Sequence, residues 1–168
     1  TDINDSNLRV KKGLITQVVN YDYSLGMVYD LIEQLEADHP DQMMFHALTL
    51  IRNIMDCQDV ALYRVDNGNY ARLFGHTSEK ACSMGRTVYL PDKEPLFESF
   101  SRQEVYLNRT MDPAYPMMAY CISEGKNMEM MLLLWSIPFE RMTIDESNRL
   151  IVISKLIQKE VKRTAAYL

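Results

Sequence analysis

Three cysteines are the side chains of this 168-residue chain best suited to redox or nucleophilic chemistry. Cys57, Cys82 and Cys121 are widely spaced, and none belongs to a CxxC pair or to a Cys/His spacing typical of a metal site. This odd number of scattered thiols is typical of a reducing compartment, so we expect a cytoplasmic protein that binds no metal. Because isolated cysteines are commonly structural, thiol chemistry would require two of them to meet in the fold.

Two histidines could in principle bind haem, His46 in a predicted helix and His76 after a predicted strand. A lone histidine without a second ligand is more often structural. The sequence also shows no glycine-rich phosphate loop, no Ser/His/Asp set and no acidic metal cluster. We therefore expect no cofactor.

Net charge and hydropathy exclude two classes of partner. The chain carries a formal charge of −5 and has a pI near 5.2, whereas a nucleic-acid-binding surface needs a clustered basic face. The apolar run at 128–138 contains one charged residue, Glu129, but it has only about half of the ~20 residues that a membrane-spanning helix requires. We expect neither nucleic-acid binding nor direct membrane insertion.

An unbroken heptad pattern near the start of the chain predicts a helix that pairs with another helix. Its apolar positions follow a 4-3-4-3-4-3 spacing and are Leu14, Val18, Tyr21, Leu25, Val28, Ile32 and Leu35. A strict 3.5-residue repeat favours a partner helix, although a helix that packs only on its own domain remains the alternative. We expect residues 1–38 to form a connecting helix and the interface of a homodimer, and residues 39–168 to form the domain proper.

The remaining elements alternate between helices and antiparallel strands. We expect a helix capped by Asp41 that runs through Cys57, a short helix over 94–102, and a last helix with a Thr143–Glu146 capping box. The Asn67-Gly68 pair is a strong hairpin signal, and a second hairpin turns at 124–127. The expected strands are 60–65, 70–75, 86–90, 105–108, 117–123 and 128–137.

The strand at 128–137 is apolar on both faces. Simple alternation places one set of side chains on each face: Met128, Met130, Leu132 and Leu134 on the first, and Met131, Leu133, Trp135 and Ile137 on the second. Such a strand is covered on both sides, so we place it in the middle of an antiparallel sheet.

The order of these elements, with the block PMMAYCISEGKNMEMMLLLWSIPFERMTIDESNRLIVISKLIQKEV, resembles a GAF domain over about residues 39–165. Phe139, Thr143, Asp145 and Glu146 occupy the matching places of the family pattern. The resemblance implies an α+β fold, with a central antiparallel sheet of five or six strands and the N- and C-terminal helices packed on one face. The mixed section at 76–116 would cover the other face, often around a small-molecule pocket.

The function that this resemblance implies is that of a non-catalytic regulatory or sensory module in a larger protein. Such modules dimerise through their terminal helices and are covalently linked to neighbouring domains. Cyclic-nucleotide binding is not expected, because Ser136-Ile137-Pro138 stands near the family's Asn-Lys place and five residues separate Phe139 from Asp145. The bilin-attaching cysteine is absent too.

The chain also resembles, more narrowly and only by association, the GAF domains of Pel-type exopolysaccharide regulators. In that group an Arg-x-x-Asp motif binds cyclic-di-GMP, but the motif lies in a separate domain. Arg109-Thr110-Met111-Asp112 has the same letters in this chain. Only two positions are fixed, so chance matches to this motif are common.

The alternative function is that of a small thiol-dependent redox enzyme, because free-methionine-sulfoxide reductases resemble GAF domains as well. These enzymes use clustered cysteines, since a sulfenic acid formed on one thiol must meet a second thiol. Cys82 lies in a predicted loop, whereas Cys57 and Cys121 fall at a helix end and on a strand. Buried, inert thiols are common in such positions.

The resemblance also indicates where a ligand would bind, between the mixed section and the sheet. Arginine favours a carboxylate or phosphate, and tyrosine adds an apolar wall with a polar tip, so we expect an anionic ligand. We expect Tyr120 to face this pocket, because its hydroxyl needs a partner. The alternative is that these are ordinary surface side chains. The candidate ligand-binding residues are Arg86, Tyr89, Tyr106, Arg109, Tyr115 and Tyr120.

Overall fold

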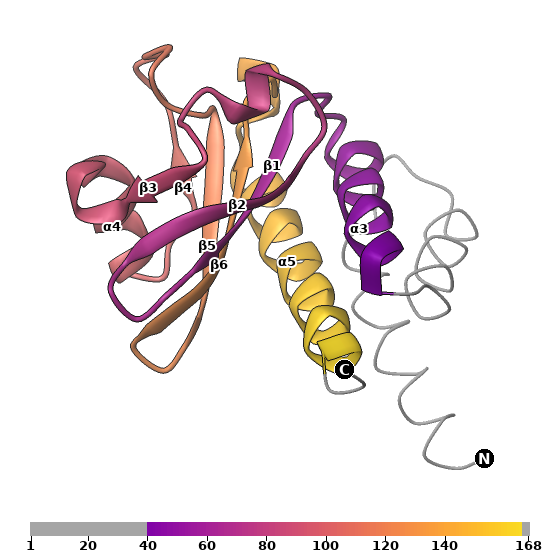
Figure 1. Cartoon of the computed structure of the whole chain (residues 1–168). Helices are drawn as coiled ribbons and strands as arrows, with labels where there is room; N and C mark the ends of the chain where they lie inside the picture. The colour runs from indigo at the N-terminus through magenta and orange to yellow at the C-terminus, as the bar shows by residue number, and fades with distance from the viewer. Residues whose placement is uncertain (1–39, 166–168) are drawn as a thin grey trace.

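The computed structural model describes residues 40–165 as one antiparallel sheet with helices on both faces (Figure 1). The predicted helix at 1–38, and with it the seven residues of the predicted dimer interface, lies outside the described residues. The helices are α3 (Pro40–Met55), α4 (Glu94–Ser101) and α5 (Ile144–Ala165), and single 3-10 turns form η1 (Lys80–Cys82), η2 (Leu90–Asp92) and η3 (Phe139–Arg141). The strands are β1 (Val60–Val65), β2 (Tyr70–His76), β3 (Thr87–Tyr89), β4 (Tyr106–Leu107), β5 (Met118–Glu124) and β6 (Asn127–Leu134).

The six strands lie in the order β3-β2-β1-β6-β5-β4, and every neighbouring pair is antiparallel. The central pair is β1 and β6, in which Leu62 stands opposite Leu132. The predicted α+β, GAF-like architecture is therefore confirmed, as is the central position of the strand that is apolar on both faces.

The long helices α3 and α5 lie side by side on one face of the sheet (Figure 1). Leu50, Ile54 and Ile153 from these helices are fully or almost fully buried against Leu132 of β6. An amphipathic helix buries one apolar stripe in this way, and the apolar area removed from water is the main stabilising term. This face is called the helix face below.

The opposite face is covered by α4 and the mixed section, as expected, and it is called the α4 face. Leu90, Leu96 and Phe100 pack there against Leu133 of β6 and Tyr63 of β1. Leu132 and Leu133, adjacent in sequence, are both fully buried in different clusters. Within the described range, no helix is long and apolar enough to cross a membrane.

Two side chains of the 128–137 run lie on the opposite face from the one predicted. Met128 packs on the α4 face, because a bulge lets Ile122 and Ser123 of β5 pair with Met130 and Met128 and leaves Glu129 as an extra residue. Ile137 packs on the helix face, since β6 ends at Leu134 and the chain no longer alternates beyond it. Strict alternation therefore holds only from Met130 to Trp135.

The first hairpin forms where Asn67-Gly68 predicts it, but with a different turn. Asp66 accepts a backbone hydrogen bond from Asn69, and its Oδ1 accepts bonds from the amides of Gly68 and Tyr70. The left-handed residue is Asn69, with φ 64°. The carboxylate of Asp66 thus favours a longer loop over the two-residue turn that Asn-Gly favours on its own.

The start predicted for α3 was wrong, and the start predicted for α5 was right. Helix α3 begins at Pro40, so Asp41 lies within the helix and is not its cap. Proline is common at the first helical position because its missing N–H has no helical acceptor there. At α5, Thr143 Oγ1 accepts a hydrogen bond of 3.2 Å from the amide of Glu146, as a capping residue does.

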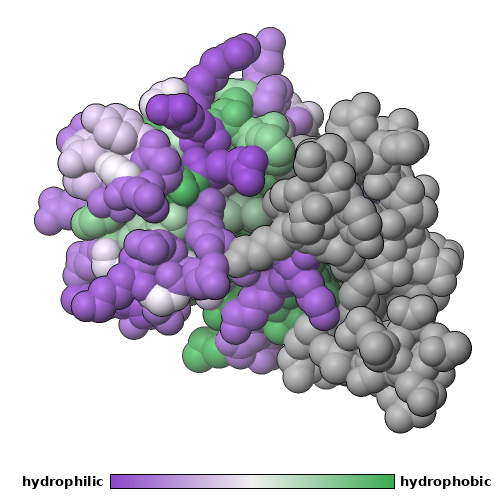
Figure 2. All heavy atoms as spheres, turned by 60° about the horizontal axis from the view of Figure 1, so that its bottom comes forward, coloured by the Kyte–Doolittle hydropathy of each residue, from purple (hydrophilic) through white to green (hydrophobic). Residues whose placement is uncertain are grey.

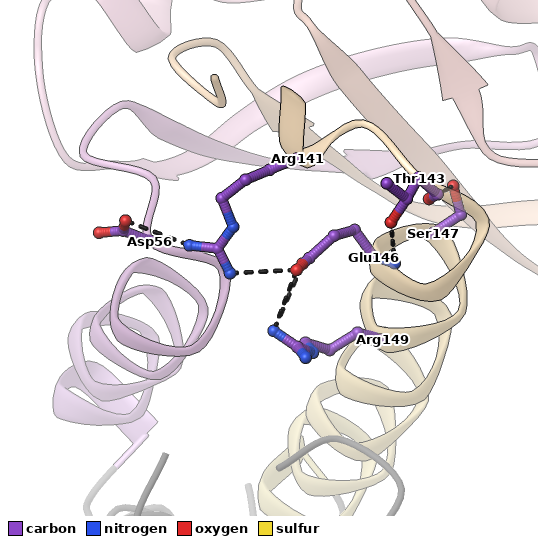
Figure 3. A network of polar contacts seen from close by, with 6 residues as sticks. All are labelled: Asp56, Arg141, Thr143, Glu146, Ser147 and Arg149. Carbon is purple, nitrogen blue, oxygen red and sulfur yellow. Dashed lines mark hydrogen bonds and ion pairs between the residues drawn. The ribbon is translucent and has the colours of Figure 1, made fainter. Parts of the chain in front are cut away.

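The Glu146 side chain does not complete the capping box and instead joins an ionic network (Figure 3). Its Oε1 lies 3.0 Å from Arg141 Nη2 and 3.2 Å from Arg149 Nη1. Arg141 also reaches Asp56, at the end of α3, with 3.1 Å between Nη1 and Oδ2. The network therefore connects the C-terminal end of α3, η3 and the first turns of α5.

Candidate functional site

A hollow of about 370 Å³ opens on the α4 face, between α4 and the turns of the two hairpins. Its apolar part is formed by Phe97, Phe100 and Met128. The polar groups on its rim come from Asn69, Ser101, Gln103, Ser123 and Lys126. The volume lies near the lower end of the range for small-molecule sites, which are about 300–1,000 Å³.

Lys126 supplies the positive charge of this hollow, from the β5–β6 turn that Gly125 makes with φ 61°. Gln103 approaches the same turn, with 3.5 Å between its Nε2 and the carbonyl oxygen of Gly125. Seen with the hairpin ends brought forward, the described surface is mainly hydrophilic, with apolar atoms in the gaps between polar side chains (Figure 2). An ammonium group beside an apolar floor suits a small anionic ligand with an apolar part.

None of the six predicted ligand-binding residues lines this hollow. Arg86, Tyr89 and Arg109 are exposed. Tyr89 precedes η2 at the end of β3, where its ring stacks on Tyr70 with 4.8 Å between the centroids. The carbonyl oxygen of Arg86 accepts a hydrogen bond of 2.7 Å from the amide of Leu73, which is a structural role for the backbone.

Tyr106 and Tyr115 are the two predicted residues that the fold brings together. Their rings lie 6.2 Å apart on the α4 face, and Lys93 Nζ lies 5.9 Å from the centroid of Tyr115. The pKa of Tyr106 is raised above its ordinary value by burial, then by Tyr115 and Asp112. The hydroxyl of Tyr106 is therefore neutral at physiological pH and can donate a hydrogen bond.

The predicted orientation of Tyr120 was wrong. Its side chain is 7% exposed and packs in the cluster on the helix face, together with Ile122 and Leu132. The neighbouring Ala119 and Cys121 face the α4 side instead. The pairing of β5 with β6 decides the orientation, because it sets which residues share a face, and Tyr120 stands opposite Leu132.

The Arg-x-x-Asp sequence at 109–112 lies in a loop that hydrogen bonds of Asn108 stabilise. Asn108 is 1% exposed, and its Nδ2 donates to the carbonyl oxygens of Asp112 and Tyr115 over 2.8 and 3.2 Å. Its Oδ1 accepts from the amide of Asp112, whose own Oδ1 accepts from the amide of Ala114. In this chain Asp112 therefore stabilises a turn.

The three thiols lie in different surroundings. Cys57 is buried on the helix face, 3.6 Å from Ser136 Oγ, whereas Cys121 is buried on the α4 face. Burial raises the pKa of Cys121 from 9.0 to about 12, so its thiol stays protonated. Cys82 is partly exposed in η1, with its Sγ 3.6 Å from the carbonyl oxygen of Ser78.

Two polar aromatic side chains belong to the buried cluster on the α4 face. Tyr63 is fully buried, and its hydroxyl donates a hydrogen bond of 2.6 Å to the carbonyl oxygen of Gly85. Burial raises its pKa from 10.0 to about 12. Trp135 packs in the same cluster, and its Nε1 is the one buried side-chain N or O atom without a hydrogen-bond partner among residues 45–159, whose side chains the structure describes. No group of three His, Cys, Asp or Glu side chains in this part of the chain is placed to hold a metal.

Sequence reasoning missed the residues that line the hollow, Lys126 and Gln103 above all. Lys126 was predicted to lie in a turn, and turn lysines are usually solvated. Lys126 lies near Gln103 because α4 packs against the β5–β6 hairpin. A local sequence pattern does not predict this packing. The one available signal was the hairpin itself, because residues at the turns of adjacent hairpins gather at one end of a sheet.

Comparison with known proteins confirms the fold. No family model matches the chain, and no curated protein matches its sequence. Among solved structures, the GAF domain of an Acinetobacter phosphoenolpyruvate-protein phosphotransferase is similar with a TM-score of 0.60 and 9% identity, over 85% of this chain and 95% of that one. The GAF domain of a putative sensor histidine kinase from Pseudomonas syringae is similar with a TM-score of 0.56 and 11% identity, over 99% and 96%.

An enzyme is found at the same level of similarity. The free methionine-R-sulfoxide reductase of Neisseria meningitidis, solved with its substrate, gives a TM-score of 0.60 and 12% identity, over 85% of this chain and 93% of that one. At such identities the similarity shows the fold alone. The chain therefore has the GAF fold, and its function has to be argued from its own residues.

Proposed function

We propose that this chain is a non-catalytic regulatory or sensory GAF module of a larger protein. In this proposal it forms a homodimer through its terminal helices and binds a small anionic ligand in the hollow on the α4 face. The single observation that carries the non-catalytic part is the burial of two of the three thiols on different sides of the sheet. Cys57 and Cys121 lie on opposite faces of the sheet, and burial holds the thiol of Cys121 in its protonated form.

The thiol-dependent reductase is the alternative, since a reductase shares the fold. Its chemistry needs a nucleophilic thiolate and a second thiol within reach. The sheet separates Cys57 from Cys121, and both of these thiols are buried. Cys82 is the one partly exposed thiol. These positions favour the module.

A turnover assay with free methionine sulfoxide and a thiol reductant decides between the two functions. We expect the wild-type chain to give the background rate, and Cys82→Ser to give the same rate. Turnover well above background that disappears in Cys82→Ser would establish the reductase and refute the module.

The hollow between α4 and the hairpin turns supports the ligand part of the proposal. It combines an apolar floor with the ammonium group of Lys126 and with amide and hydroxyl groups on its rim. A carboxylate or phosphate beside Lys126 would form a charge-assisted hydrogen bond, which is stronger than a neutral one. Tyr106 and Tyr115, beside Lys93, are a second place on the same face where an anion could bind.

The proposed dimer rests on the heptad pattern at 14–35, because a strict 3.5-residue repeat favours a partner helix. Leu25 stands in the middle of that pattern, and a carboxylate introduced there would be buried without a partner. Sedimentation at tens of micromolar should give a dimer for the wild type and a shift toward monomer for Leu25→Glu. A monomeric wild type at that concentration would rule out this mode of assembly.

A further inference from the structure

Part of the helix face carries large exposed side chains. Outward-pointing residues of β1, β2 and β3 form this surface, which lies beyond the part of the sheet that α3 and α5 cover. We call it the aromatic–arginine face, and it consists of Arg64, Tyr70, Arg72, Phe74 and Tyr89.

Strand register places four of these side chains on one surface, and the contact between Phe74 and Arg64 adds the fifth. Arg64 stands opposite Arg72, and Tyr70 stands opposite Tyr89. Their neighbours in sequence, such as Tyr63 and Ala71, point the other way into the α4-face core. Aromatic rings and an arginine therefore alternate along β2, with a second arginine beside them on β1 and a second tyrosine on β3.

Contacts among these side chains hold them in place. The rings of Tyr70 and Tyr89 lie 4.8 Å apart at an angle of 39°. The guanidinium carbon of Arg64 lies 5.1 Å from the centroid of Phe74, which is a cation–π contact. The order that a binding surface needs is thus largely present before a partner arrives, and this lowers the entropic cost of association.

The exposure of these rings is unusual for a side of a domain that faces only water. Tyr70, Phe74 and Tyr89 are 44%, 45% and 39% exposed. Single exposed apolar residues need no explanation, but a contiguous group of large ones indicates an interaction site. Tyrosine and arginine are also the residue types that contribute most to binding at protein interfaces.

Charge complementarity identifies the kind of partner. The chain as a whole has a net charge of −5, yet this face presents Arg64 and Arg72. Asp66 approaches Arg72, with 3.9 Å between Oδ2 and Nη2, and an exposed pair of this geometry contributes little. A partner that brings carboxylates would gain from both guanidiniums.

Two other occupants fit the charge less well. Two arginines on an acidic chain provide little phosphate neutralisation, so nucleic acid is disfavoured. A two-fold pairing of this face with itself would bring four arginines, two from each copy, into one interface. An acidic polypeptide with aromatic side chains matches both the charge and the rings.

A second hollow adjoins this face and offers a place for an anchoring side chain. It has a volume of about 350 Å³ and lies between the ends of the two hairpins and α5. Arg64 and Asn67 line one side, and Glu129 and Gln158 line the other, with 2.6 Å between Glu129 Oε2 and Gln158 Nε2. The bulge at Glu129 brings this carboxylate next to Met130 on the helix face.

We propose that the aromatic–arginine face is a docking surface for an acidic, aromatic-containing polypeptide segment of a partner protein. Its guanidiniums bind the carboxylates of the segment, its rings stack on aromatic side chains, and the hollow beside Arg64 receives an anchor. This surface is separate from the ligand hollow on the α4 face.

Fluorescence anisotropy with a labelled random copolymer of glutamate and tyrosine tests the proposal, with polyglutamate of equal length as reference. We expect saturable binding of the copolymer that weakens with added salt, and weaker binding of polyglutamate. Arg72→Gln and Phe74→Ser should each weaken copolymer binding about tenfold, the size of effect typical of an interface hot spot.

Matched control variants separate this surface from general charge and hydrophobicity. Arg102 and Phe139 are exposed elsewhere in the fold, so Arg102→Gln and Phe139→Ser should leave copolymer binding unchanged. All four changes lie at exposed side chains, and thermal melts that match the wild type verify folding. A second ring variant, Tyr70→Ser, repeats the test of Phe74→Ser at another place on the face.

Four results would overturn the proposal. They are no saturable copolymer binding by the wild type; equal losses in the control variants; tighter binding of an oligo-dT strand than of the copolymer; and self-association of the wild type in sedimentation that Phe74→Ser abolishes. The third result would assign the face to nucleic acid, and the fourth would assign it to a second copy of the chain.

Discussion

Replacement of Glu146 by glutamine changes the shape of the side chain very little, but we expect it to destabilise the fold strongly. The side chain of Glu146 is 11% exposed, and that of Arg149 is 3% exposed. The carboxylate accepts hydrogen bonds from Arg141 and Arg149 at the same time. Glutamine keeps the shape but removes the negative charge that both guanidiniums share (Figure 3).

The expected loss follows from the burial of these groups. Removing one partner of a buried ion pair typically costs about 3–5 kcal/mol, because the other charge stays desolvated. Glutamine still accepts one hydrogen bond, so we expect a value near the lower end, roughly 3 kcal/mol. A domain of this size loses about 2–4 °C in Tm per kcal/mol, which predicts a decrease of roughly 6–12 °C.

Glu98→Gln is the matched control for this change. Glu98 also pairs with an arginine on its own helix, Arg102, with 2.8 Å between Oε1 and Nη2, but the two side chains are 57% and 64% exposed. An exposed pair contributes about 0–1 kcal/mol, so this variant should melt close to the wild type. Thermal melts of both variants decide the matter. If Glu146→Gln and Glu98→Gln had the same Tm, the ionic network would not stabilise the connection between α3 and α5 as its geometry indicates.

Two further predictions concern the core. Leu132→Ala and Leu133→Ala should each cost about 2–5 kcal/mol in urea unfolding, because both side chains are fully buried in different clusters; a nearly neutral result at either position would mean that its face is open to water. Folding raises the pKa of the Cys121 thiol from 9.0 to about 12, so the unfolded thiol ionises first and stability should decrease as pH rises from 9.0 toward about 12. Urea unfolding across that interval should show a shallower decrease for Cys121→Ala, and an unchanged slope would contradict the burial argument.

The architecture could be predicted from the sequence because its signals are local. Alternation of apolar residues from Met130 to Trp135 placed β6 in the centre of the sheet, and the Thr143 cap placed the start of α5. Errors arose where a longer-range contact overrode the local pattern. Glu146 has the spacing of a capping box, but Arg141 and Arg149 bind its carboxylate instead.

The candidate site could be predicted only as a region. Tyr106 and Tyr115 do face the α4 side, because the mixed section covers that face as expected. Tyr120 faces the helices instead, because neighbouring positions on a strand point to opposite faces of the sheet. Lys126 lines the hollow through the packing of α4 on a hairpin turn, a contact between segments far apart in sequence.

The most direct test of the proposed function is a thermal-shift screen of carboxylate and phosphate metabolites on three forms of the chain. We expect at least one compound that stabilises the wild type, by about 2.7 kcal/mol at 100 times its dissociation constant. This stabilisation should be lost in Lys126→Gln, which lines the hollow, and kept in Arg109→Ala, which does not. A screen without any stabilising anion, or a hit that Arg109→Ala abolishes and Lys126→Gln retains, would contradict ligand binding in this hollow.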